Sequence, residues 1–449
     1  MRRVVIMGAG GRDFHDFNTV FREDPSVRVV AFTAAQIPGI ADRVYPPSLA
    51  GPRYPRGIPI HPEEDLEELV HVHGVDTVVL SYSDLSHAEV MHKAARALAA
   101  GADFALLGPR STMLEASRPV VAVTAVRTGS GKSPTSRAVA SLLRDAGLRV
   151  GLVRHPMPYG DLERQRVQRF ASIADIDAAS PTLEEREEFE EPVALGIVVY
   201  AGVDYGAVLE LAQSESDVLV WDGGNNDLPF VRPDLHVVVA DALRPEATRG
   251  FHPGETNLLL ADVVVVNKVD AAEPGAVERV LADVREANPY ATVVTARSPV
   301  SLEPGPPLRG KRVLVVEDGP TLTHGGMAFG AGTVAALAEG VAELVDPRPY
   351  ARGSIADTFA AYPHLGRVLP AMGYSPTMLR ELEETIDAAD ADVVVVGTPI
   401  DLGRLLRVRH PLRRARYRLE EAGSPTLADV LAPLIEAQRT PPRAAARPA

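Results

Sequence analysis

The chain has 449 residues, a formal net charge of −14 at pH 7 and no cysteine. This length exceeds a single core, so we expect two to four domains of about 100–200 residues each. The lack of cysteine excludes disulfides and thiolate chemistry, and the negative charge argues against a general nucleic-acid-binding protein. No apolar run approaches the ~20 residues that a membrane span needs, and the N-terminal Met-Arg-Arg leaves no room for a signal peptide. We therefore expect a cytoplasmic protein that binds neither nucleic acid nor membranes.

Residues 1–118 alternate short apolar strands with helices, which predicts a Rossmann-like α/β unit with a parallel sheet. The expected strands are residues 3–7, 27–32, 76–80 and 104–107, and the expected helices are residues 63–70 and 86–100. Gly8 and Gly10 follow the first strand at the usual ligand position, but Asp13 replaces the third glycine of the dinucleotide pattern. The loop could hold a phosphate or another anion, hold a dinucleotide, or only form a tight turn.

A glycine turn between a predicted strand and a predicted helix is the central signal of the chain. Residues 121–126 form an apolar run, residues 129–133 read Gly-Ser-Gly-Lys-Ser, and a helical pattern follows. Gly129, Ser130 and Gly131 allow backbone N–H groups to converge on phosphate oxygens. Lys132 adds a positive charge, and the hydroxyl of Ser133 is placed to ligate Mg²⁺. Although position 126 holds valine where the usual pattern has glycine, residues 119–308 are predicted to form a P-loop NTPase domain around a mainly parallel sheet.

Two later strands also end in polar residues at the edge where ligands bind. The strand at 149–153 leads into Arg154 and His155, and the prolines around position 157 exclude a helix there. We expect these two side chains to contact the substrate, with a purely structural loop as the alternative. The strand at 217–222 ends at Asp222 before two glycines, as expected for a carboxylate that organises Mg²⁺. Ser133 and Asp222 are therefore the predicted metal ligands.

A further strand, at 262–267, leads into the tetrad Asn-Lys-Val-Asp at 267–270. This tetrad is typical of guanine recognition. Asp270 would accept hydrogen bonds from the guanine N1–H and N2 amine, Lys268 would cover the ring, and Asn267 would help to read the base. The pattern favours GTP over ATP, and both nucleotides stay open.

Residues 309–438 are predicted to form a third α/β unit. Its first strand, at 311–317, leads into a glycine-rich loop that contains His324. We expect His324 to act as an acid/base group or as a phosphate ligand, with a simple turn histidine as the alternative. Residues 439–449 are rich in proline, alanine and arginine, and we expect them to be a disordered tail.

The P-loop, the aspartate-glycine-glycine strand end and the Asn-Lys-Val-Asp tetrad, in this order, resemble the GTPase class that includes signal-recognition and metallochaperone GTPases. A lysine of that class stands where this chain has Arg127, and the resemblance implies that Arg127 reaches across a dimer interface to a neighbour's phosphate. The whole chain is similar to the predicted-GTPase family of cyclic 2,3-diphosphoglycerate synthetase-like proteins. Residues 6–14, 154–161, 221–227 and 317–325 carry this likeness. It implies ATP-driven closure of an intramolecular phosphoanhydride in 2,3-bisphosphoglycerate.

We therefore expect a Mg²⁺-dependent NTPase that couples nucleotide hydrolysis to phosphoryl transfer or ligation on a small anionic substrate. The expected catalytic side chains come from the glycine turn, two strand ends and two loops. They are Arg127, Lys132, His155, Asp222 and His324. The alternative is a regulatory or metallochaperone-type GTPase that acts on a protein partner. In either case we expect a homodimer.

Overall fold

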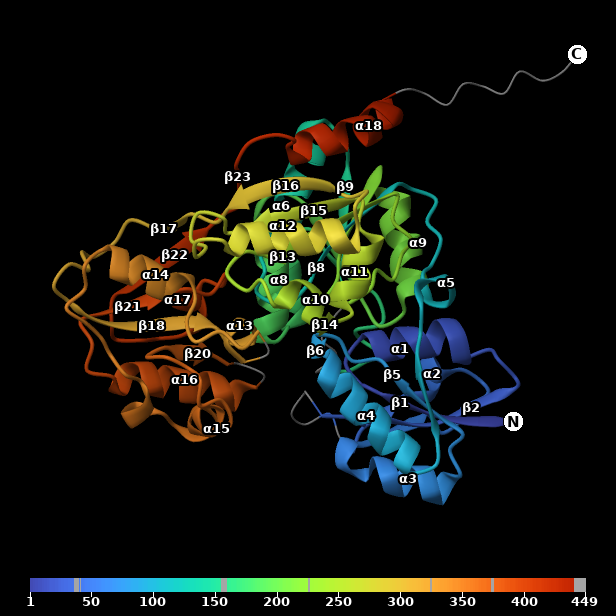
Figure 1. Ribbon diagram of the computed structural model, residues 1–449. Coiled ribbons are helices and arrows are strands. Elements are labelled where there is room, and N and C mark those ends of the chain that lie inside the picture. The colour runs from blue at the N-terminus through green and yellow to red at the C-terminus, as the bar shows by residue number, and fades with distance from the viewer. Residues whose placement is uncertain are drawn as a thin grey trace, which may run out of the picture.

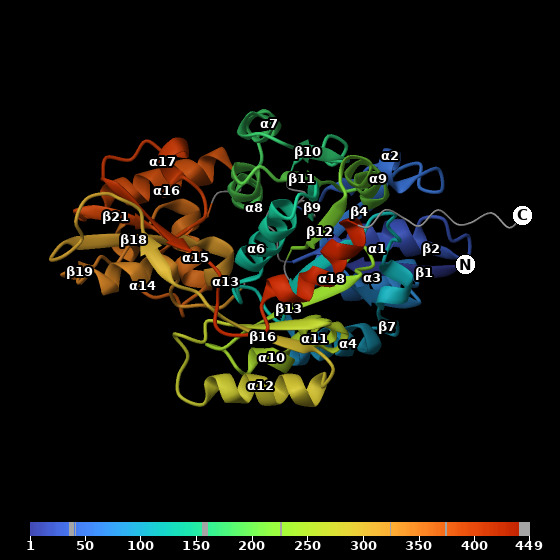
Figure 2. The ribbon, with the colours of Figure 1, turned by 90° about the horizontal axis from the view of Figure 1, so that it is seen from above.

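The computed structural model describes residues 1–35, 40, 42–154, 160–224, 227–323, 325–372 and 375–439. Within these residues, three mainly parallel sheets follow one another along the chain, and helices cover both faces of each sheet (Figure 1). Figure 2 shows the central unit between the N-terminal unit and the C-terminal unit. This arrangement confirms the predicted α/β class. None of the described helices combines the length and the apolar character that a membrane span requires.

The N-terminal unit has the strand order β3-β4-β2-β1-β5-β7, with only β3 antiparallel to its neighbour. Its strands are β1 (Arg2–Met7), β2 (Val27–Ala34), β3 (Val44–Tyr45), β4 (Ile58–Pro62), β5 (Thr77–Leu80) and β7 (Asp103–Leu106). Its helices are α1 (Arg12–Asp16), α2 (Pro47–Ala50), α3 (Leu66–His73), α4 (His87–Ala99) and α5 (Pro109–Thr112). In β1, Val4 and Ile6 face one apolar cluster, and Val5 and Met7 face another. A strand buried on both faces needs the continuous apolar run that the sequence has here.

The central unit has the strand order β10-β11-β9-β12-β8-β13-β15-β16-β23, with the two outer strands antiparallel. Its strands are β8 (Val120–Ala125), β9 (Val150–Arg154), β10 (Gln168–Phe170), β11 (Val198–Ala201), β12 (Val218–Asp222), β13 (Leu235–Asp241), β15 (Val263–Asn267), β16 (Thr292–Arg297) and β23 (Glu420–Glu421). Its helices are α6 (Lys132–Asp145), α7 (Ile173–Ala179), α8 (Leu183–Ala194), α9 (Tyr205–Glu215), α10 (Ala247–Gly250), α11 (Gly254–Leu260), α12 (Ala276–Ala287) and α18 (Leu427–Arg439). The helices α6, α7, α8 and α18 cover one face, and α9, α11 and α12 cover the other.

The C-terminal unit has the strand order β17-β22-β21-β18-β19, and β20 also pairs with β18. Its strands are β17 (Val300–Leu302), β18 (Arg312–Asp318), β19 (Glu343–Leu344), β20 (Leu369–Ala371), β21 (Val393–Val396) and β22 (Leu412–Tyr417). Its helices are α13 (Gly319–Thr323), α14 (Ala331–Ala338), α15 (Gly353–Ala361), α16 (Pro376–Ala388) and α17 (Leu402–Leu405). The inner strands β18 and β21 are buried between two apolar clusters, as in the other units.

Several short elements tie the units together. β17 begins at Val300, before the expected boundary at 308, and pairs with β22. β23 and α18 return from the C-terminal segment to the central unit, where Leu427 and Leu431 join the core under α6. Arg439, the first residue of the expected tail, belongs to α18, and the rest of that tail lies outside the described residues. An antiparallel pair of β6 (Leu85–Ser86) and β14 (Phe251–His252) links the N-terminal and central units.

Candidate active site

The turn between β8 and α6 has the strand–glycine turn–helix order that phosphate binding requires. Gly129 and Gly131 have φ angles of 81° and 107°, a region that side chains other than glycine rarely occupy. A Cβ at Gly131 would also lie 2.2 Å from Nδ2 of Asn267. Helix α6 begins at Lys132. Its N-terminal backbone N–H groups and dipole therefore meet the turn, which is how P-loops hold phosphate oxygens.

Lys132 and Arg154 both bind the carboxylate of Asp222. Lys132 Nζ donates to Asp222 Oδ1, and Arg154 Nη1 lies 2.7 Å from Asp222 Oδ2. Arg154 Nη2 lies 2.5 Å from Oε1 of Glu188 on α8. Burial acts to raise the pKa of Asp222, but Arg154 and Lys132 outweigh it and hold that pKa below its usual value. Two cations thus meet one strand-end carboxylate beside the glycine turn, so either cation can turn to a phosphate.

The predicted Mg²⁺ ligands are a hydroxyl and a carboxylate, and hard oxygen ligands of this kind suit Mg²⁺. Ser133 lines the pocket in the first turn of α6, and Asp222 is 3% exposed at the end of β12. Nowhere in the described chain do three or more histidine or acidic side chains gather to hold an ion by themselves. The hydroxyl of Ser133 and the carboxylate of Asp222 fit an ion that would share its coordination with nucleotide phosphates and water.

The Asn-Lys-Val-Asp segment supports the glycine turn directly. Asn267 Nδ2 donates to the backbone oxygen of Ser130 at 3.0 Å. Lys268 Nζ donates to the backbone oxygen of Gly129 at 2.6 Å. Asp270 lines the same pocket, and its Oδ1 accepts from the backbone N–H of Ser298 at 3.2 Å. The tetrad therefore fixes the turn with its first two side chains and presents the carboxylate of the fourth to the pocket.

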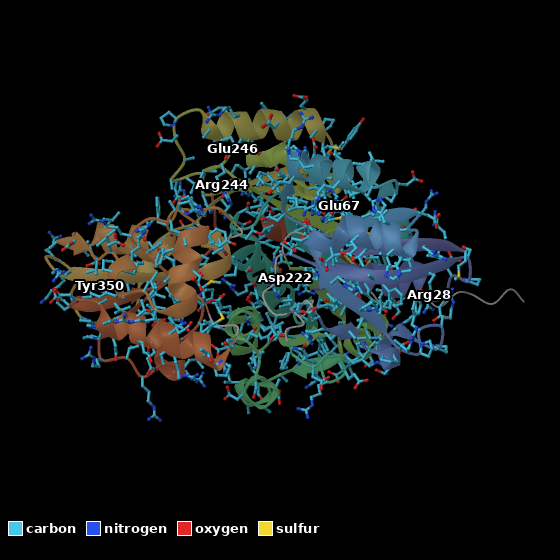
Figure 3. All side chains as sticks on the ribbon, turned by 90° about the horizontal axis from the view of Figure 1, so that it is seen from below. Arg28, Glu67, Asp222, Arg244, Glu246 and Tyr350 are labelled. Carbon is cyan, nitrogen blue, oxygen red and sulfur yellow. The ribbon has the colours of Figure 1, made fainter. Side chains whose placement is uncertain are left out.

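Arg244 connects the glycine turn to the C-terminal unit. Its Nε donates to Asp241 Oδ2 at 3.0 Å, and its Nη2 donates to the backbone oxygen of Thr128 at 2.7 Å. Its Nη1 donates to the backbone oxygen of Gly325, in the loop after α13, at 2.9 Å. Figure 3 shows Arg244 between the C-terminal unit and the central unit, away from Arg28 at the far side of the molecule. One half-buried guanidinium thus connects the P-loop to the third unit.

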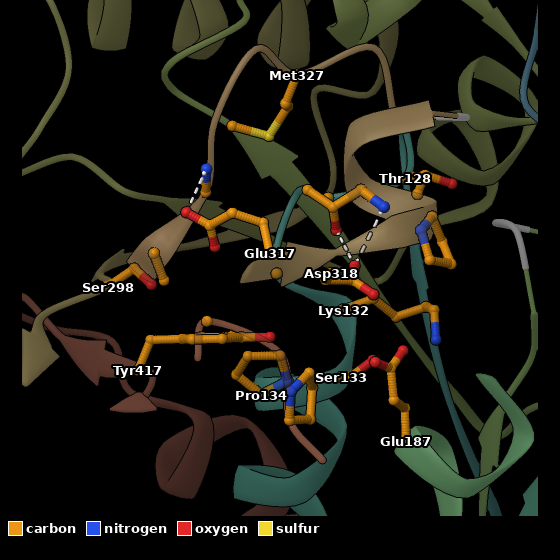
Figure 4. Close-up of a pocket in the computed structure, with 18 of the residues that line it drawn as sticks. Thr128, Lys132, Ser133, Pro134, Glu187, Ser298, Glu317, Asp318, Met327 and Tyr417 are labelled. Atoms are coloured by element: carbon orange, nitrogen blue, oxygen red, sulfur yellow. Dashed lines mark hydrogen bonds between the residues drawn. The ribbon is translucent and has the colours of Figure 1, made fainter. Parts of the chain in front are cut away.

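A pocket of about 310 Å³ lies where the three units meet, a size in the range of small-molecule sites. Gly10 follows β1, Lys132 follows β8 and Asp318 ends β18, and all three line this pocket. The carboxyl ends of the three sheets therefore converge on one site. Figure 4 shows Lys132 and Ser133 with Glu187 and Asp318 around the same space.

The C-terminal wall of the pocket contains a carboxylate that is fully engaged within the protein. Glu317 accepts from the backbone N–H groups of Gly330 at 3.0 Å, Gly332 at 3.1 Å and Thr333 at 2.7 Å, at the start of α14. Burial raises its pKa, and the hydrogen bonds oppose that shift. Beside it, Asp318 accepts from the backbone N–H of Thr321 at 3.1 Å. This wall is therefore rigid and acidic.

The glycine loop after β1 is filled by its own aspartate. Asp13 accepts from the backbone N–H of Gly10 at 2.9 Å to Oδ2, of Gly11 at 3.3 Å and of Phe14 at 2.7 Å. A Cβ at Gly8 would lie 2.7 Å from Asp13 Oδ2. The side chain that replaces the third glycine thus occupies the place where a bound anion would accept these hydrogen bonds. The amide of Gly10 is accordingly taken within the chain.

Of the expected catalytic residues, one lies away from the pocket and two fall outside the described residues. The guanidinium of Arg127 lies 3.9 Å from the ring centroid of Phe251 of the same chain, and its predicted reach across a dimer interface stays a prediction. His155 and His324 fall outside the described residues. The predicted roles of these histidines and the expected homodimer stay predictions.

Sequence reasoning did not single out two side chains that border the site. Glu188 binds Arg154, and Tyr417 at the end of β22 lines the pocket. Glu188 belongs to an acidic run that also fits a solvated helix face, and Tyr417 lies in a strand without a motif. The role of Glu188 becomes visible only in the structure, where α8 places it against Arg154 at the end of β9.

The fold and the glycine turn define an α/β protein with a P-loop NTPase core. Among solved structures, LpxK from Aquifex aeolicus in complex with ATP has a TM-score of 0.42 and 13% identity, with coverage of 72% of this chain and 90% of that chain. The hydrogenase maturation factor HypB from Archaeoglobus fulgidus has a TM-score of 0.26 and 17% identity, with coverage of 42% and 83%. No protein-family model matches the sequence.

A curated protein is far more similar. The arginine synthetase ArcE of Thermococcus kodakarensis is 57% identical over 430 residues, which cover 96% of each chain. The chain belongs to the family of this arginine synthetase.

Proposed function

We propose that this protein is a nucleoside-triphosphate-dependent ligase that forms arginine. The convergence of Lys132 and Arg154 on Asp222, beside a pocket bordered by all three units, carries the proposal. The arginine synthetase that shares 57% of its residues across nearly the whole chain supports the choice of product. A pocket shared by three units suits a reaction in which a nucleotide, an acceptor and a nitrogen donor must meet.

The chemistry of the product sets what the site must do. A ureido carbonyl becomes a guanidinium when its C–O bond is replaced by a C–N bond, and oxygen leaves poorly until it is phosphorylated. In the proposed reaction the ureido oxygen attacks the γ-phosphorus and releases the nucleoside diphosphate. Ammonium then loses a proton to solvent, the resulting ammonia forms the new C–N bond, and phosphate leaves with the oxygen. Most of the catalytic effect would come from positioning and charge neutralisation, as in other phosphoryl transfers.

The described residues suit these roles. Lys132 and the N–H groups of the glycine turn would hold the β- and γ-phosphates. Arg154, already beside Asp222, would stabilise the charge that develops on the transferred phosphoryl group. Ser133 and Asp222 would hold Mg²⁺, which neutralises phosphate charge when it is bound.

Asp270 supports a nucleotide whose base offers N–H donors to a carboxylate. Guanine offers two such donors at N1 and N2, and adenine offers only its N6 amine, so GTP is the preferred nucleotide in this proposal. We expect Asp270→Asn to raise the KM for GTP by about tenfold or more, since it replaces an acceptor of two charge-assisted hydrogen bonds. An equal KM for GTP in the parent and the variant would show that Asp270 does not read the base.

Two alternatives remain within the proposal. The motifs that resemble cyclic 2,3-diphosphoglycerate synthetases favour an intramolecular phosphoanhydride as product, and the Asn-Lys-Val-Asp tetrad also suits a GTPase that switches a partner protein. Each shares the nucleotide site with the arginine-forming reaction. The acceptor substrate differs among the three reactions and therefore distinguishes them.

The test is steady-state release of nucleoside diphosphate with Mg²⁺ and either GTP or ATP, with organic products followed by ³¹P NMR and amino-acid analysis. Citrulline with ammonium, 2,3-bisphosphoglycerate and no acceptor are compared. Arginine that accumulates in step with the diphosphate supports the proposal. A cyclic phosphoanhydride product supports the first alternative. Slow hydrolysis whose rate does not change with either acceptor would rule out arginine formation and favour the GTPase switch.

A further inference from the structure

A second polar site lies between α1 of the N-terminal unit and the loop after β12. Arg12 and Asp16 of α1 are 7% and 1% exposed. Arg12 Nη1 donates to the backbone oxygen of Leu228 at 3.1 Å, and its Nε lies 3.6 Å from Asp16 Oδ2. The same Oδ2 accepts from the hydroxyl of Ser81 at 2.8 Å. Figure 1 shows α1 on the side of the N-terminal unit that faces the central unit. Charged groups are therefore buried at the boundary of two units.

Aromatic rings of the central unit surround α1 at this boundary. The ring of His15 stacks on Phe230 with 4.0 Å between centroids. Tyr205 lies 5.6 Å from His15, 4.7 Å from Phe230 and 5.6 Å from Trp221. Phe230 also contacts Trp221, at 4.7 Å. These rings exclude water, and Tyr205 and Phe230 pack directly against His15 of α1.

Three buried polar atoms near α1 have no hydrogen-bond partner among the described residues. Within the described chain, Asp16 Oδ1, the hydroxyl of Tyr205 and Nε1 of Trp221 are buried without a hydrogen-bond partner. The three residues are 1%, 3% and 0% exposed. Buried polar groups are normally paired, and a bound molecule or ion is one explanation for a group that is not. A carboxylate oxygen, a hydroxyl and an N–H are thus available to a ligand.

The charge balance selects the kind of ligand. Burial, and after it the charge of Asp227, raises the pKa of Asp16 to about 6, so this carboxylate is mostly charged at neutral pH. Burial lowers the pKa of His15 to about 3 and that of His252 to about 4, so neither ring supplies a positive charge. Arg12 is the neighbouring cation and lies beside Asp16, and the negative charge of Asp227 acts on both Asp16 and Tyr205. A positively charged group that donates N–H bonds would balance the remaining charge and also lie well against the aromatic rings.

The second site adjoins the nucleotide pocket. Gly10, two residues before Arg12, and Gly224, three residues before Asp227, both line that pocket. Arg154 lines it too, and its charge reaches Tyr205, where it opposes the raised pKa of that phenol. The site therefore adjoins the pocket next to Arg154.

We propose that Arg12, Asp16, Tyr205, Trp221 and Asp227, the interface cluster, bind the primary ammonium group of a substrate. Asp16 Oδ1 and the hydroxyl of Tyr205 accept from its N–H groups. The ammonium group is that of free ammonium, the nitrogen donor, or the α-ammonium group of the amino-acid acceptor, in which case the Trp221 N–H donates to the carboxylate. The inference rests on the proposed function for the identity of the substrates, and on the geometry alone for the site.

The first measurement needs no turnover. The melting temperature of the full chain is compared in ammonium chloride and in sodium chloride at equal ionic strength, and with and without citrulline. The expected result is a rise of about 2 °C or more with ammonium or with citrulline. Asp16→Asn abolishes this rise, and Glu210→Gln, which removes an exposed charge on α9, retains it. Trp221→Phe separates the two sources, because it weakens the response to citrulline and leaves the response to ammonium unchanged.

The second measurement is the KM of each substrate in the coupled reaction. Asp16→Asn is expected to raise the KM for ammonium or for the amino acid at least about tenfold, and to leave the KM for the nucleotide within about twofold. Tyr205→Phe, which keeps the ring, is expected to raise the same KM about threefold and serves as the second variant if Asp16→Asn does not fold.

The outcomes separate this inference from the proposed function. If no arginine forms but ammonium or citrulline stabilises the parent and not Asp16→Asn, the site stands and the product assignment fails. If arginine forms while Asp16→Asn and Tyr205→Phe leave every KM unchanged, the site is overturned and the function stands. A parent that neither compound stabilises also overturns the site.

Discussion

Arg154 and Asp222 form an ion pair with 2.7 Å between Nη1 and Oδ2, and both side chains are 4% exposed. The pair joins the ends of the neighbouring parallel strands β9 and β12. Lys132 binds the second oxygen of the same carboxylate from the start of α6. The three charges therefore hold one another where two strands and a helix meet. A bound triphosphate would compete with Asp222 for both cations, so binding and catalysis draw on the same contacts.

The first prediction concerns Lys132. We expect Lys132→Ala to abolish nucleotide-driven turnover, a loss of at least about 10²–10³-fold, because one charged donor to the transferred phosphate is removed. Lys311→Ala, at an exposed position before β18, is the matched control and should keep the parent rate. The measurement is diphosphate release at saturating nucleotide. A Lys132→Ala protein that hydrolyses nucleotide at the parent rate would contradict the assignment of the P-loop.

The second prediction compares two arginines at opposite ends of β9. Arg154→Ala should lower the free energy of unfolding by about 3–5 kcal/mol, because it removes one of the two cations beside the buried carboxylate of Asp222 and the partner of the half-buried Glu188. Arg149 forms an ion pair with Asp217 at 2.6 Å, but its side chain is 63% exposed. Its replacement by alanine should cost only about 0–1 kcal/mol. Urea unfolding of both variants measures the difference, and equal losses would contradict the buried role of Arg154.

Local sequence was enough to predict the fold class and the strand–turn–helix order around Lys132. The apolar run, the glycines and the helical pattern are adjacent in the chain, and each element is dictated by its own residues. The strand that ends at Asp222 and the strand before Asn267 follow the same logic. These features need no knowledge of what lies opposite them.

Contacts between distant segments could not be predicted in the same way. Asp13 replaces a glycine in the first loop, but only the structure shows that its carboxylate binds the loop amides. Arg127 lies over Phe251 because β14 pairs with β6 of another unit. Helix α18 covers the central core, although its amphipathic pattern would fit any apolar face. In each case the determining partner is far away in the sequence.

The third prediction separates two effects of a side chain in the glycine turn. Gly131→Ala places a Cβ 2.2 Å from Asn267 Nδ2 at a φ of 107°. Gly147 has a φ of 92°, and nothing lies within 4 Å of its added Cβ. Gly147→Ala should therefore show only the backbone strain, about 1 kcal/mol in the free energy of unfolding. Gly131→Ala should show a larger loss and weaken nucleotide binding about tenfold or more, since the turn must move. Equal nucleotide Kd values for the parent and Gly131→Ala would show that the turn does not bind the phosphates.

The fourth prediction is a pH dependence of stability that originates at Asp16. Burial raises the pKa of this carboxyl from 3.8 to about 6, so the folded protein binds the proton more tightly than the unfolded chain does. Stability from this group is fully present below about pH 4 and is lost as the pH rises through 6. A shift of about two units corresponds to about 3 kcal/mol at neutral pH. Asp16→Asn removes that loss of stability. The variant also loses about 1 kcal/mol, because its hydrogen bond from Ser81 is weaker.

Asp16→Asn should therefore be more stable than the parent at pH 7–8 and lose this advantage at pH 4. Burial also raises the pKa of Asp13 to about 6. Asp13 therefore contributes a similar pH dependence of stability to both proteins. Urea unfolding between pH 4 and pH 8 measures the two curves, with Glu210→Gln as the variant whose curve should follow the parent. Parallel curves for the parent and Asp16→Asn would show that the pKa of Asp16 is not raised in the folded protein. A charge kept at a cost in stability is what a binding site for a cation requires, so the same variant links the stability of the interface cluster to its function.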